Sequence, residues 1–195
     1  MKNNTIIKYK DLTESQKIEL IEIVIDCFGH LMTFTKNKDV LKSLFLSGLN
    51  PDYTFAYVEE STVVGMLGLG TNSIRPLKFH KDTCVKLFGK VKGSILEKQM
   101  NAIFQSKTVK ENTDLYIDFL ATAKSSRGKG IATKLLEFSF SLSGYTDFYI
   151  EVFSKNINAK RLYEKLGFSI IKKNKLSFLL LQGNGYPIKM KRSHT

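Results

Sequence analysis

The sequence contains few residues that cross-link a chain or anchor it in a membrane, and each shortage excludes a class of protein. Cys27 and Cys84 are the only cysteines, and neither lies near another metal-binding residue type at the spacing of a metal site. We therefore expect free, partly buried thiols, with neither a disulfide framework nor a metal centre. No apolar run approaches the ~18 residues of a membrane span, and residues 1–12 lack the apolar core of a signal peptide. These features predict a cytoplasmic location and no membrane partner.

Acidic residues are scarce relative to basic ones, since 18 Asp and Glu stand against 30 Lys and Arg, for a net charge of +12. The basic residues are spread along the 195-residue chain. The two densest clusters, at 172–175 and 189–192, lack the interleaved aromatics of a nucleic-acid module. Nucleic acid is therefore not expected as the main partner, whereas the charge favours a polyanionic small molecule.

Hydrophobic periodicity predicts alternating strands and helices in one domain. The strands are expected at residues 5–10, 53–59, 62–69, 115–122, 148–153, 168–172 and 186–190. One helix is expected from the capping residues 11–14 to Gly29, and others at 38–46, 94–104, 131–140 and 156–166. Because a helix separates the strands at 115–122 and 148–153, these two should be parallel, which makes the sheet mixed.

Two parts of the first half depart from regular patterns. Gly65, Gly68 and Gly70 interrupt the strand at 62–69, which indicates a bulge or a close backbone contact there. Residues 73–112 carry the weakest periodicity. We interpret them as a mostly helical insertion between two strands, with the role of a lid or one wall of a pocket.

The stretch at 115–132 carries the clearest chemistry. A strand-like run is followed by a polar turn at 123–126, by Arg-Gly-Lys-Gly at 127–130, and directly afterwards by a helical pattern. Glycine lets the backbone approach a ligand closely, and the N–H groups at the start of a helix favour an anion. Since Arg127 and Lys129 add two cations, the stretch predicts a site for a phosphate or pyrophosphate.

A dinucleotide-binding oxidoreductase that uses NAD is one alternative for this stretch. Gly128 and Gly130 open a helix after a strand, and Glu151 follows about 20 residues later, where a ribose-binding acid would lie. Thr133, however, occupies the position of the third glycine. The motif also lies in the middle of the chain, and it leaves the segment at 156–168 unexplained.

Two separated motifs resemble those of the GNAT N-acetyltransferase family. The first consists of Leu120-Ala121-Thr122, then Arg127-Gly128-Lys129-Gly130-Ile131-Ala132, then Leu135-Leu136. The second is Asn156-x-x-Ala159-x-x-Leu162-Tyr163-Glu164-Lys165-Leu166-Gly167-Phe168. Both stand in the family's order, with one helix and one strand between them, and the resemblance covers residues 113–172. Ser125 stands where the family often has Gln or Arg, which removes one side-chain contact and leaves the backbone cradle.

The resemblance implies a fold and a cofactor. The fold is a three-layer α/β arrangement, in which helices cover both faces of a mixed, mostly antiparallel sheet and one parallel strand pair splays apart at the acetyl-CoA site. Residues 1–72 would form the acceptor-side half of a single domain, 73–112 the insertion, and 113–195 the acetyl-CoA-binding half. Acetyl-CoA would act as co-substrate without a metal, and the implied contacts are Leu120, Ala121, Thr122, Arg127, Gly128, Lys129, Gly130, Ile131, Ala132 and Asn156.

The resemblance also implies direct transfer of an acetyl group to a primary amine within a ternary complex. Tyr163 fits the family's general acid, and aromatic packing alone is the alternative for its ring. Asn156 would fix the strand-to-helix turn and reach the cofactor, with helix capping alone as the alternative.

The general base is left open among several side chains. Asp118 is preferred, because an acid inside an otherwise apolar strand is a candidate for a raised pKa. Strict alternation places it on the sheet face opposite Ile117 and Phe119. Glu151, in the next strand, follows as a candidate, and His30 and His80 come after it.

The acceptor and the assembly state are also left open. A small amine, an aminoglycoside-like polyamine, an amino acid and a peptide amine all remain candidates, as does a homodimer. A non-catalytic acyl-CoA-binding or nucleic-acid-binding module on the same fold is the alternative to an enzyme.

Overall fold

The computed structural model describes residues 4–175 and 183–194. The strands are β1 (Asn4–Lys8), β2 (Thr54–Glu59), β3 (Thr62–Gly70), β4 (Asp114–Thr122), β5 (Asp147–Phe153), β6 (Ser169–Lys173) and β7 (Pro187–Ser193). The α-helices are α1 (Glu14–Phe28), α2 (Lys38–Gly48), α3 (Lys81–Phe88), α4 (Lys90–Phe104), α5 (Ile131–Phe140) and α6 (Ile157–Lys165). Apart from α3, every one of these elements was predicted from the periodicity of the sequence.

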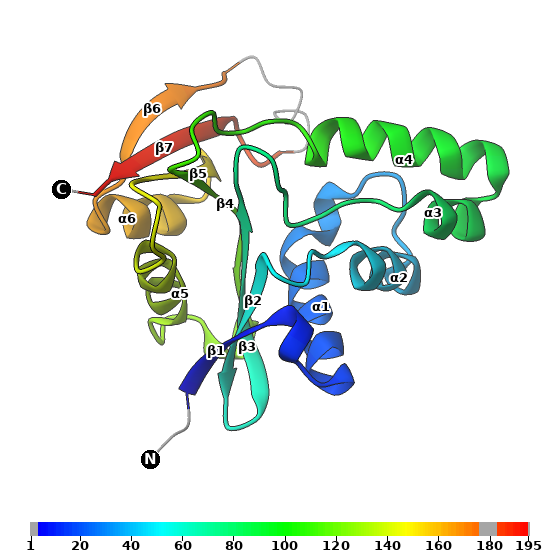
Figure 1. The fold of residues 1–195 in the computed structure, drawn as a ribbon, viewed down its shortest axis with the longest axis horizontal. Helices are drawn as coiled ribbons and strands as arrows, with labels where there is room; N and C mark the ends of the chain where they lie inside the picture. Colours follow the sequence, from blue (N-terminus) through cyan, green and yellow to red (C-terminus); the bar gives the residue numbers. More distant parts are fainter. Residues whose placement is uncertain (1–3, 176–182, 195) are drawn as a thin grey trace.

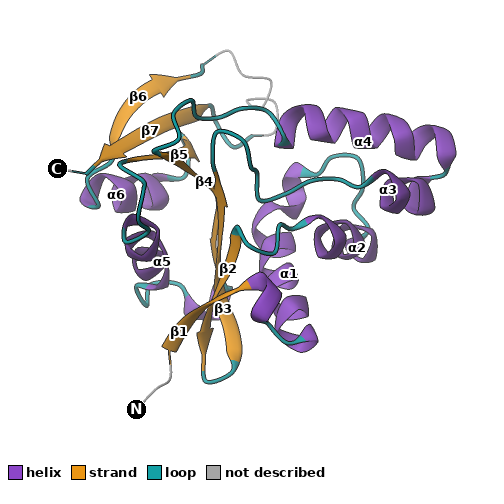
Figure 2. Cartoon of the chain, viewed as in Figure 1, coloured by secondary structure: helices purple, strands orange, loops and turns teal. Residues whose placement is uncertain are grey.

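One seven-stranded sheet forms the middle layer, in the order β1-β2-β3-β4-β5-β7-β6. All neighbouring strands are antiparallel except β4 and β5, which are parallel. Helices α1, α2, α3 and α4 lie on one side of the sheet, and α5 and α6 lie on the other (Figure 1). Figure 2 shows the same three layers coloured by secondary structure. The predicted three-layer fold with a mixed, mostly antiparallel sheet is confirmed.

Two apolar clusters hold the layers together, one on each face of the sheet. On the first face, Val24 of α1 and Phe45 of α2 are buried against β3 and β4. On the second face, Leu135 of α5 and Phe148 of β5 are fully buried together. Burying a side chain of this size contributes about 1.5–3 kcal/mol. The packing therefore fixes α1 and α5 on opposite sides of the same two strands.

Helix α1 begins with a capping box at Thr13. The Thr13 side chain accepts a hydrogen bond from the Gln16 N–H at 3.2 Å, and the Gln16 side chain accepts one from the Thr13 N–H at 3.1 Å. The helix ends at Phe28, where a short 3₁₀ turn, Gly29–Leu31, follows. This end of α1 brings residues 26–34 beside the carboxyl end of β4.

Strands β4 and β5 are paired over only part of their length. The register joins residues 114–117 of β4 to residues 147–150 of β5. Strand β4 nevertheless continues to Thr122, and β5 continues to Phe153. The two parallel strands therefore diverge beyond Ile117, and in the described parts of the chain the β5-facing edge of residues 118–122 has no strand beside it.

A β-bulge in β4 marks the point where the strands separate. Gly68 of β3 pairs with Phe119, and the next residue, Leu69, pairs with Ile117, so that Asp118 is the extra residue. Ile117 packs in the cluster on the second face, whereas Phe119 packs in the cluster on the first. The prediction that these two side chains share a face is therefore wrong, because a bulged residue interrupts the period-two alternation and bends the strand.

The glycines of β3 admit close neighbours, as predicted. A Cβ atom at Gly65 would lie 2.7 Å from Cγ2 of Ile131, the first residue of α5. A Cβ atom at Gly70 would lie 2.6 Å from a carboxylate oxygen of Asp118. Glycine at these positions lets the start of α5 and the bulge of β4 lie directly against β3.

The segment at 73–112 contains α3 and α4, which pack against each other. The Asn101 side chain of α4 accepts from the Phe79 N–H and donates to the Phe79 carbonyl, both at 2.8 Å. This pair of hydrogen bonds ties α4 to the chain that precedes α3. The sequence predicted only residues 94–104 as helix, because α3 is short and α4 begins after a glycine with positive φ, Gly89.

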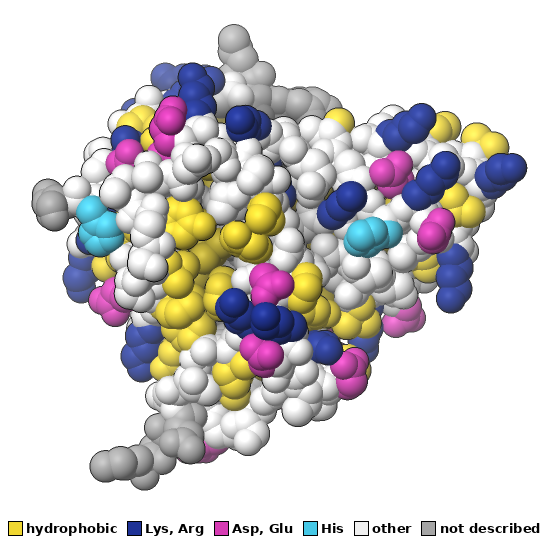
Figure 3. Space-filling model, viewed as in Figure 1, with side chains coloured by type: hydrophobic (Ala, Val, Ile, Leu, Met, Phe, Trp, Pro, Cys, Tyr) yellow, Lys and Arg dark blue, Asp and Glu magenta, His cyan; other side chains and the backbone are white. Residues whose placement is uncertain are grey.

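On the face shown in Figure 3, Lys and Arg side chains are spread among acidic ones and do not form one basic band. Across residues 4–175 and 183–194, no helix is both long enough and apolar enough to cross a membrane. Cys27 is half-buried and Cys84 buried, and both are free thiols, as predicted.

Candidate active site

The stretch predicted as a phosphate cradle is the turn between β4 and α5. Gly128 and Gly130 both have φ +78°, a left-handed conformation that favours glycine. Gly130 is the N-cap of α5, and the helix's first backbone bond runs from the Lys134 N–H to the Gly130 carbonyl at 3.1 Å. The N–H groups of residues 131–133 therefore point out of the helix N-terminus, where they favour an anion. Lys129 is exposed on the same turn.

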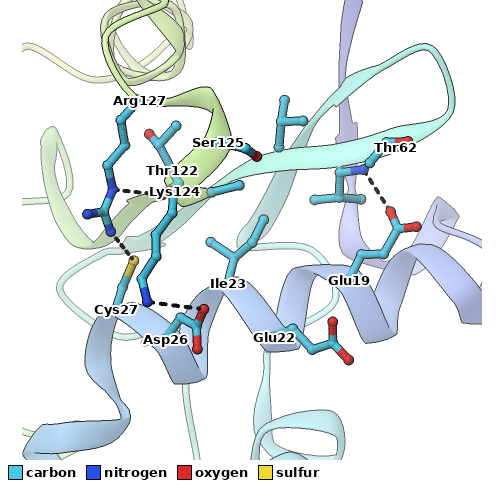
Figure 4. A pocket seen from close by; sticks show the side chains of 13 residues that line it. Glu19, Glu22, Ile23, Asp26, Cys27, Thr62, Thr122, Lys124, Ser125 and Arg127 are labelled. Atoms are coloured by element: carbon cyan, nitrogen blue, oxygen red, sulfur yellow. Dashed lines mark hydrogen bonds and ion pairs between the residues drawn. The ribbon is translucent and has the colours of Figure 1, made fainter.

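Two cations extend from this turn toward α1. Figure 4 shows Arg127 and Lys124 directed at the helix, where Cys27 and Asp26 lie. Lys124 Nζ is 3.9 Å from Asp26 Oδ2, Arg127 Nη2 is 3.7 Å from Cys27 Sγ, and Arg127 Nε is 3.5 Å from the Thr122 carbonyl. These contacts are long, and Arg127 is exposed, so the guanidinium can turn toward a phosphate at little cost.

Two cavities meet where β4 and β5 diverge. The cradle cavity, of about 750 Å³, lies between the turn, the starts of α5 and α6, and the end of α1. The inner cavity, of about 430 Å³, lies between β4, β5, residues 28–34 and the C-terminal half of α4. Phe28, Leu120 and Asn156 line both cavities. One elongated ligand can therefore extend from the cradle through the gap between the strands.

Most of the predicted cofactor contacts come together in the cradle cavity. Every one of the ten predicted residues except Lys129 lines it. The cavity also has a wall at the end of α1, made by Asp26, Cys27, Phe28 and His30. Of these four, the sequence indicated His30 alone, as a candidate base. No local motif marks this wall, because α1 reaches the cradle only through packing across the sheet.

Asn156 lies at the junction of the two cavities. Its Oδ1 accepts a hydrogen bond from the Ala159 N–H at 3.2 Å, which caps the start of α6. The capping role that was weighed as the alternative is therefore present. The same residue is exposed and lines both cavities, so the cap also holds it at the place where they join.

Tyr163 is one of the residues that line the inner cavity. Its ring packs on Phe168 with the ring centres 6.0 Å apart, and only 6% of the residue is exposed. Burial raises the pKa of the Tyr163 phenol well above its ordinary value of 10.0. The raised pKa keeps the phenol protonated at neutral pH, on a residue that lines the inner cavity.

Asp118, the bulged residue, is held by Arg75. The guanidinium donates to both carboxylate oxygens, at 3.0 Å from Nε to Oδ2 and through a second bond from Nη2 to Oδ1. The two side chains are only 7% and 9% exposed. Burial raises the pKa of Asp118, and the adjacent guanidinium opposes that rise. Arg75 also donates to the Ser106 carbonyl, which links the bulge to the end of the helical insertion.

Arg75 is a site residue that sequence reasoning missed. It lies in the loop after β3, 43 residues from Asp118, and no motif connects the two positions. The only sequence signal for Arg75 is indirect: an acid inside an apolar strand needs a basic partner from elsewhere in the chain.

The remaining acid–base candidates fall in different places. Glu151 of β5 lines the inner cavity together with Asp118 and Tyr116. His30 lines the cradle cavity, while His80 is the residue that precedes α3. Asp118 and Glu151 therefore face the inner cavity, and the two histidines do not line it. Within the described ranges, no three His, Cys, Asp or Glu residues are grouped as metal ligands.

Comparison with known proteins agrees with this arrangement of elements. The model of the acetyltransferase (GNAT) family matches residues 18–168 of the chain. An N-acetyltransferase from Staphylococcus aureus Mu50 has a TM-score of 0.64 to this structure at 16% identity, covering 96% of this chain and 99% of that one. A chain of the NatC complex bound to Gag peptide and CoA has a TM-score of 0.60 at 16% identity, covering 98% and 99%.

The chain therefore belongs to the acetyltransferase (GNAT) family. In sequence it is similar to the chloroplastic GCN5-related N-acetyltransferase 6 of Arabidopsis thaliana, with 42% identity over 67 residues. That match covers 33% of this chain and only 23% of the relative's length.

Proposed function

We propose that the protein binds acetyl-CoA across the gap between β4 and β5 and transfers its acetyl group directly to a primary amine. The observation that carries this proposal is the meeting of the two cavities at the unpaired edge of β4. One cavity opens onto a helix N-terminus with left-handed glycines. The other holds Tyr163 and two carboxylates.

The chain offers a separate contact for each part of coenzyme A. The N–H groups of residues 131–133 and the cations of Arg127 and Lys129 suit the phosphates. The edge of residues 118–122 is free to hydrogen-bond the pantetheine arm as an added strand would. A backbone N–H near Leu120 would then polarise the thioester carbonyl, as an oxyanion donor does. The acetyl group would lie at the entrance of the inner cavity.

Acetyl transfer requires a neutral amine. An alkyl amine with a pKa near 10.4 is protonated at pH 7, and its free base costs about 4–5 kcal/mol to populate. We assign removal of that proton to Asp118, because its raised pKa brings it closer to neutral pH and Arg75 fixes its orientation. Glu151, on the same wall, would attract the cationic amine before the proton leaves.

Tyr163 would supply the proton at the other end of the reaction. The amine nitrogen bonds to the acetyl carbon and the carbon–sulfur bond breaks. The nitrogen then releases its second proton to water, the sulfur takes one proton from Tyr163, and water returns a proton to the phenol. The products are an amide and a free CoA thiol. Since burial keeps the Tyr163 phenol protonated, it can hydrogen-bond the departing sulfur and stabilise its negative charge.

Release of the CoA thiol tests this proposal. The protein is incubated with acetyl-CoA and single primary amines, the thiol is measured with a colorimetric reagent, and the acetylated amine is identified by mass. We expect amine-dependent thiol release, with one amide formed for each thiol.

Thermal unfolding with each cofactor separates the alternatives. Acetyl-CoA should raise the Tm and NAD should not, because saturating ligand stabilises the state that binds it. Stabilisation by acetyl-CoA without thiol release for any amine would favour a non-catalytic acyl-CoA-binding module. Stabilisation by NAD alone would favour the oxidoreductase.

A further inference from the structure

The walls of the inner cavity differ in polarity. On the side away from β5 it is lined by aromatic, thioether and aliphatic side chains, including Phe34 from the segment after α1, Phe119 from β4, and Met100, Ile103 and Phe104 from α4. Its charged lining residues, among those that the structure describes, are Asp118 and Glu151 alone. Thr33, Tyr116, Asn156 and Tyr163 are its uncharged polar lining residues, and the others are apolar. The cavity is therefore mostly apolar and acidic at one place.

The apolar wall is held by contacts between rings. Phe119 packs on Phe28 with ring centres 5.3 Å apart and on Phe104 at 6.4 Å. Phe79 continues the series, at 5.7 Å from Phe104 and 6.3 Å from Phe34. Edge-to-face and offset contacts of this kind stabilise ring pairs beyond the area that they bury. The wall is thus preformed and joins three separate parts of the chain.

The two carboxylates of the inner cavity, Asp118 and Glu151, leave room for one cationic amine. Both oxygens of Asp118 already accept hydrogen bonds from Arg75. Glu151 is the exposed carboxylate of the pair. A second ammonium group, or a row of hydroxyls, would be moved from water onto phenylalanine and methionine side chains without a partner, which is costly.

We propose that the acceptor is a primary amine carried on a single apolar group of about the size of an aromatic ring, and that the wall from Phe34 to Phe104 binds that group. This inference rests on the proposed acetyl transfer and specifies its second substrate. The shared chemistry fits a free arylalkyl amine and the N-terminal residue of a peptide. It disfavours a polyamine or an aminoglycoside, two of the acceptor types that the sequence left open.

A panel of amines tests the preference, with kcat/KM measured from thiol release at saturating acetyl-CoA. The small probes are 2-phenylethylamine, ethylamine, spermidine and kanamycin. We expect 2-phenylethylamine to exceed ethylamine by about 10- to 100-fold, because the two differ by a buried ring. Two peptides, Phe-Ala-Ala and Ser-Ala-Ala, identify the source. A larger kcat/KM for Phe-Ala-Ala than for 2-phenylethylamine assigns the ring to a peptide N-terminus, and the reverse order assigns it to a free amine.

Two exposed isoleucine and valine positions on α4 provide a variant and its matched control. Ile103 is 61% exposed and lines the inner cavity, whereas Val91 is 72% exposed on the same helix and does not line it. Neither substitution disturbs the core, so both variants should fold. Ile103→Asp should lower kcat/KM for 2-phenylethylamine about tenfold, and by a larger factor than it lowers the value for ethylamine. Val91→Asp should change neither value.

The possible failures are distinguishable. A kcat/KM for spermidine, kanamycin or ethylamine that equals or exceeds that for 2-phenylethylamine would overturn the apolar acceptor while the acetyl transfer itself stands. The same conclusion would follow if Ile103→Asp and Val91→Asp behaved alike. No thiol release with any amine would overturn the proposed function, and the acceptor assignment with it.

Discussion

Tyr163 is the proposed general acid, and its burial keeps the phenol protonated. Removing its hydroxyl by Tyr163→Phe keeps the packing on Phe168. We expect kcat to fall about 100-fold or more, as for the loss of a general acid, while the acetyl-CoA Kd stays within twofold. Steady-state kinetics and calorimetry measure the two values. Equal turnover in the variant would leave Tyr163 with a packing role alone.

The raised pKa of Tyr163 also sets a pH dependence of stability. The unfolded phenol ionises near pH 10, while the folded phenol stays protonated because its pKa is higher. The stabilisation is therefore complete below pH 10 and declines as the pH rises above it. Between pH 9 and pH 11, the wild-type protein should lose about 1.4 kcal/mol more unfolding free energy than Tyr163→Phe. Urea unfolding of both proteins measures this difference, and parallel curves would contradict it.

The raised pKa of Asp118 beside Arg75 should place the acidic limb of the pH–rate profile above the pH at which an ordinary aspartate titrates. A base with a raised pKa loses activity as the pH falls through that value, so the limb should lie above the ordinary range of an aspartate. Arg75→Met removes the charge that opposes the rise, and the limb should move to higher pH. Arg75→Lys keeps a positive charge and should shift it less. Asp118→Asn should abolish the limb.

The pH–rate profile and a folding check together separate a catalytic role of Asp118 from a structural one. Breaking a buried ion pair by removing one partner costs about 3–5 kcal/mol, so circular dichroism must first show that each variant is folded. An acidic limb that persists in Asp118→Asn would assign the base elsewhere, with Glu151 the next candidate on the same wall.

The junction of β4, turn and α5 is the element whose backbone matters most. Gly130 has φ +78° and open space around its missing Cβ. Gly130→Val should cost about 1–2 kcal/mol of stability through strain, and its side chain should project in front of the helix N-terminus. We expect acetyl-CoA affinity to fall at least tenfold by calorimetry. Gly144→Val is the matched control, because Gly144 has φ +88° and equally open surroundings. It should lose stability and keep affinity, and equal affinity losses would remove the cradle assignment.

How far the sequence predicts each element depends on whether its cause is local. The cradle was predictable, because glycines with a helical pattern directly after a strand act within ten residues. The β4 bulge was not, because Asp118 becomes the extra residue only through its register with β3. Glycines in β3 indicated that a bulge or close contact lay nearby, without giving its position.

For the whole molecule, the sequence predicted the lining of the cradle cavity far better than that of the inner cavity. Nine predicted contacts line the cradle cavity, since they belong to two continuous motifs. The inner cavity takes Phe34 from the segment after α1, Phe104 from α4, and Asp118, the partner of Arg75, from β4. These segments meet only through the packing of separate layers, which periodicity does not report. Helix α4 does form a wall, as was expected of the insertion.

The two cavities share Phe28, Leu120 and Asn156 as lining residues, which supports the proposal that both substrates bind at once. Direct transfer then requires both to be bound before the CoA thiol leaves. Initial rates measured while acetyl-CoA and 2-phenylethylamine are varied together test this most directly. We predict double-reciprocal lines that intersect. Parallel lines, with an acetyl group trapped on the chain in the absence of amine, would contradict direct transfer in a ternary complex.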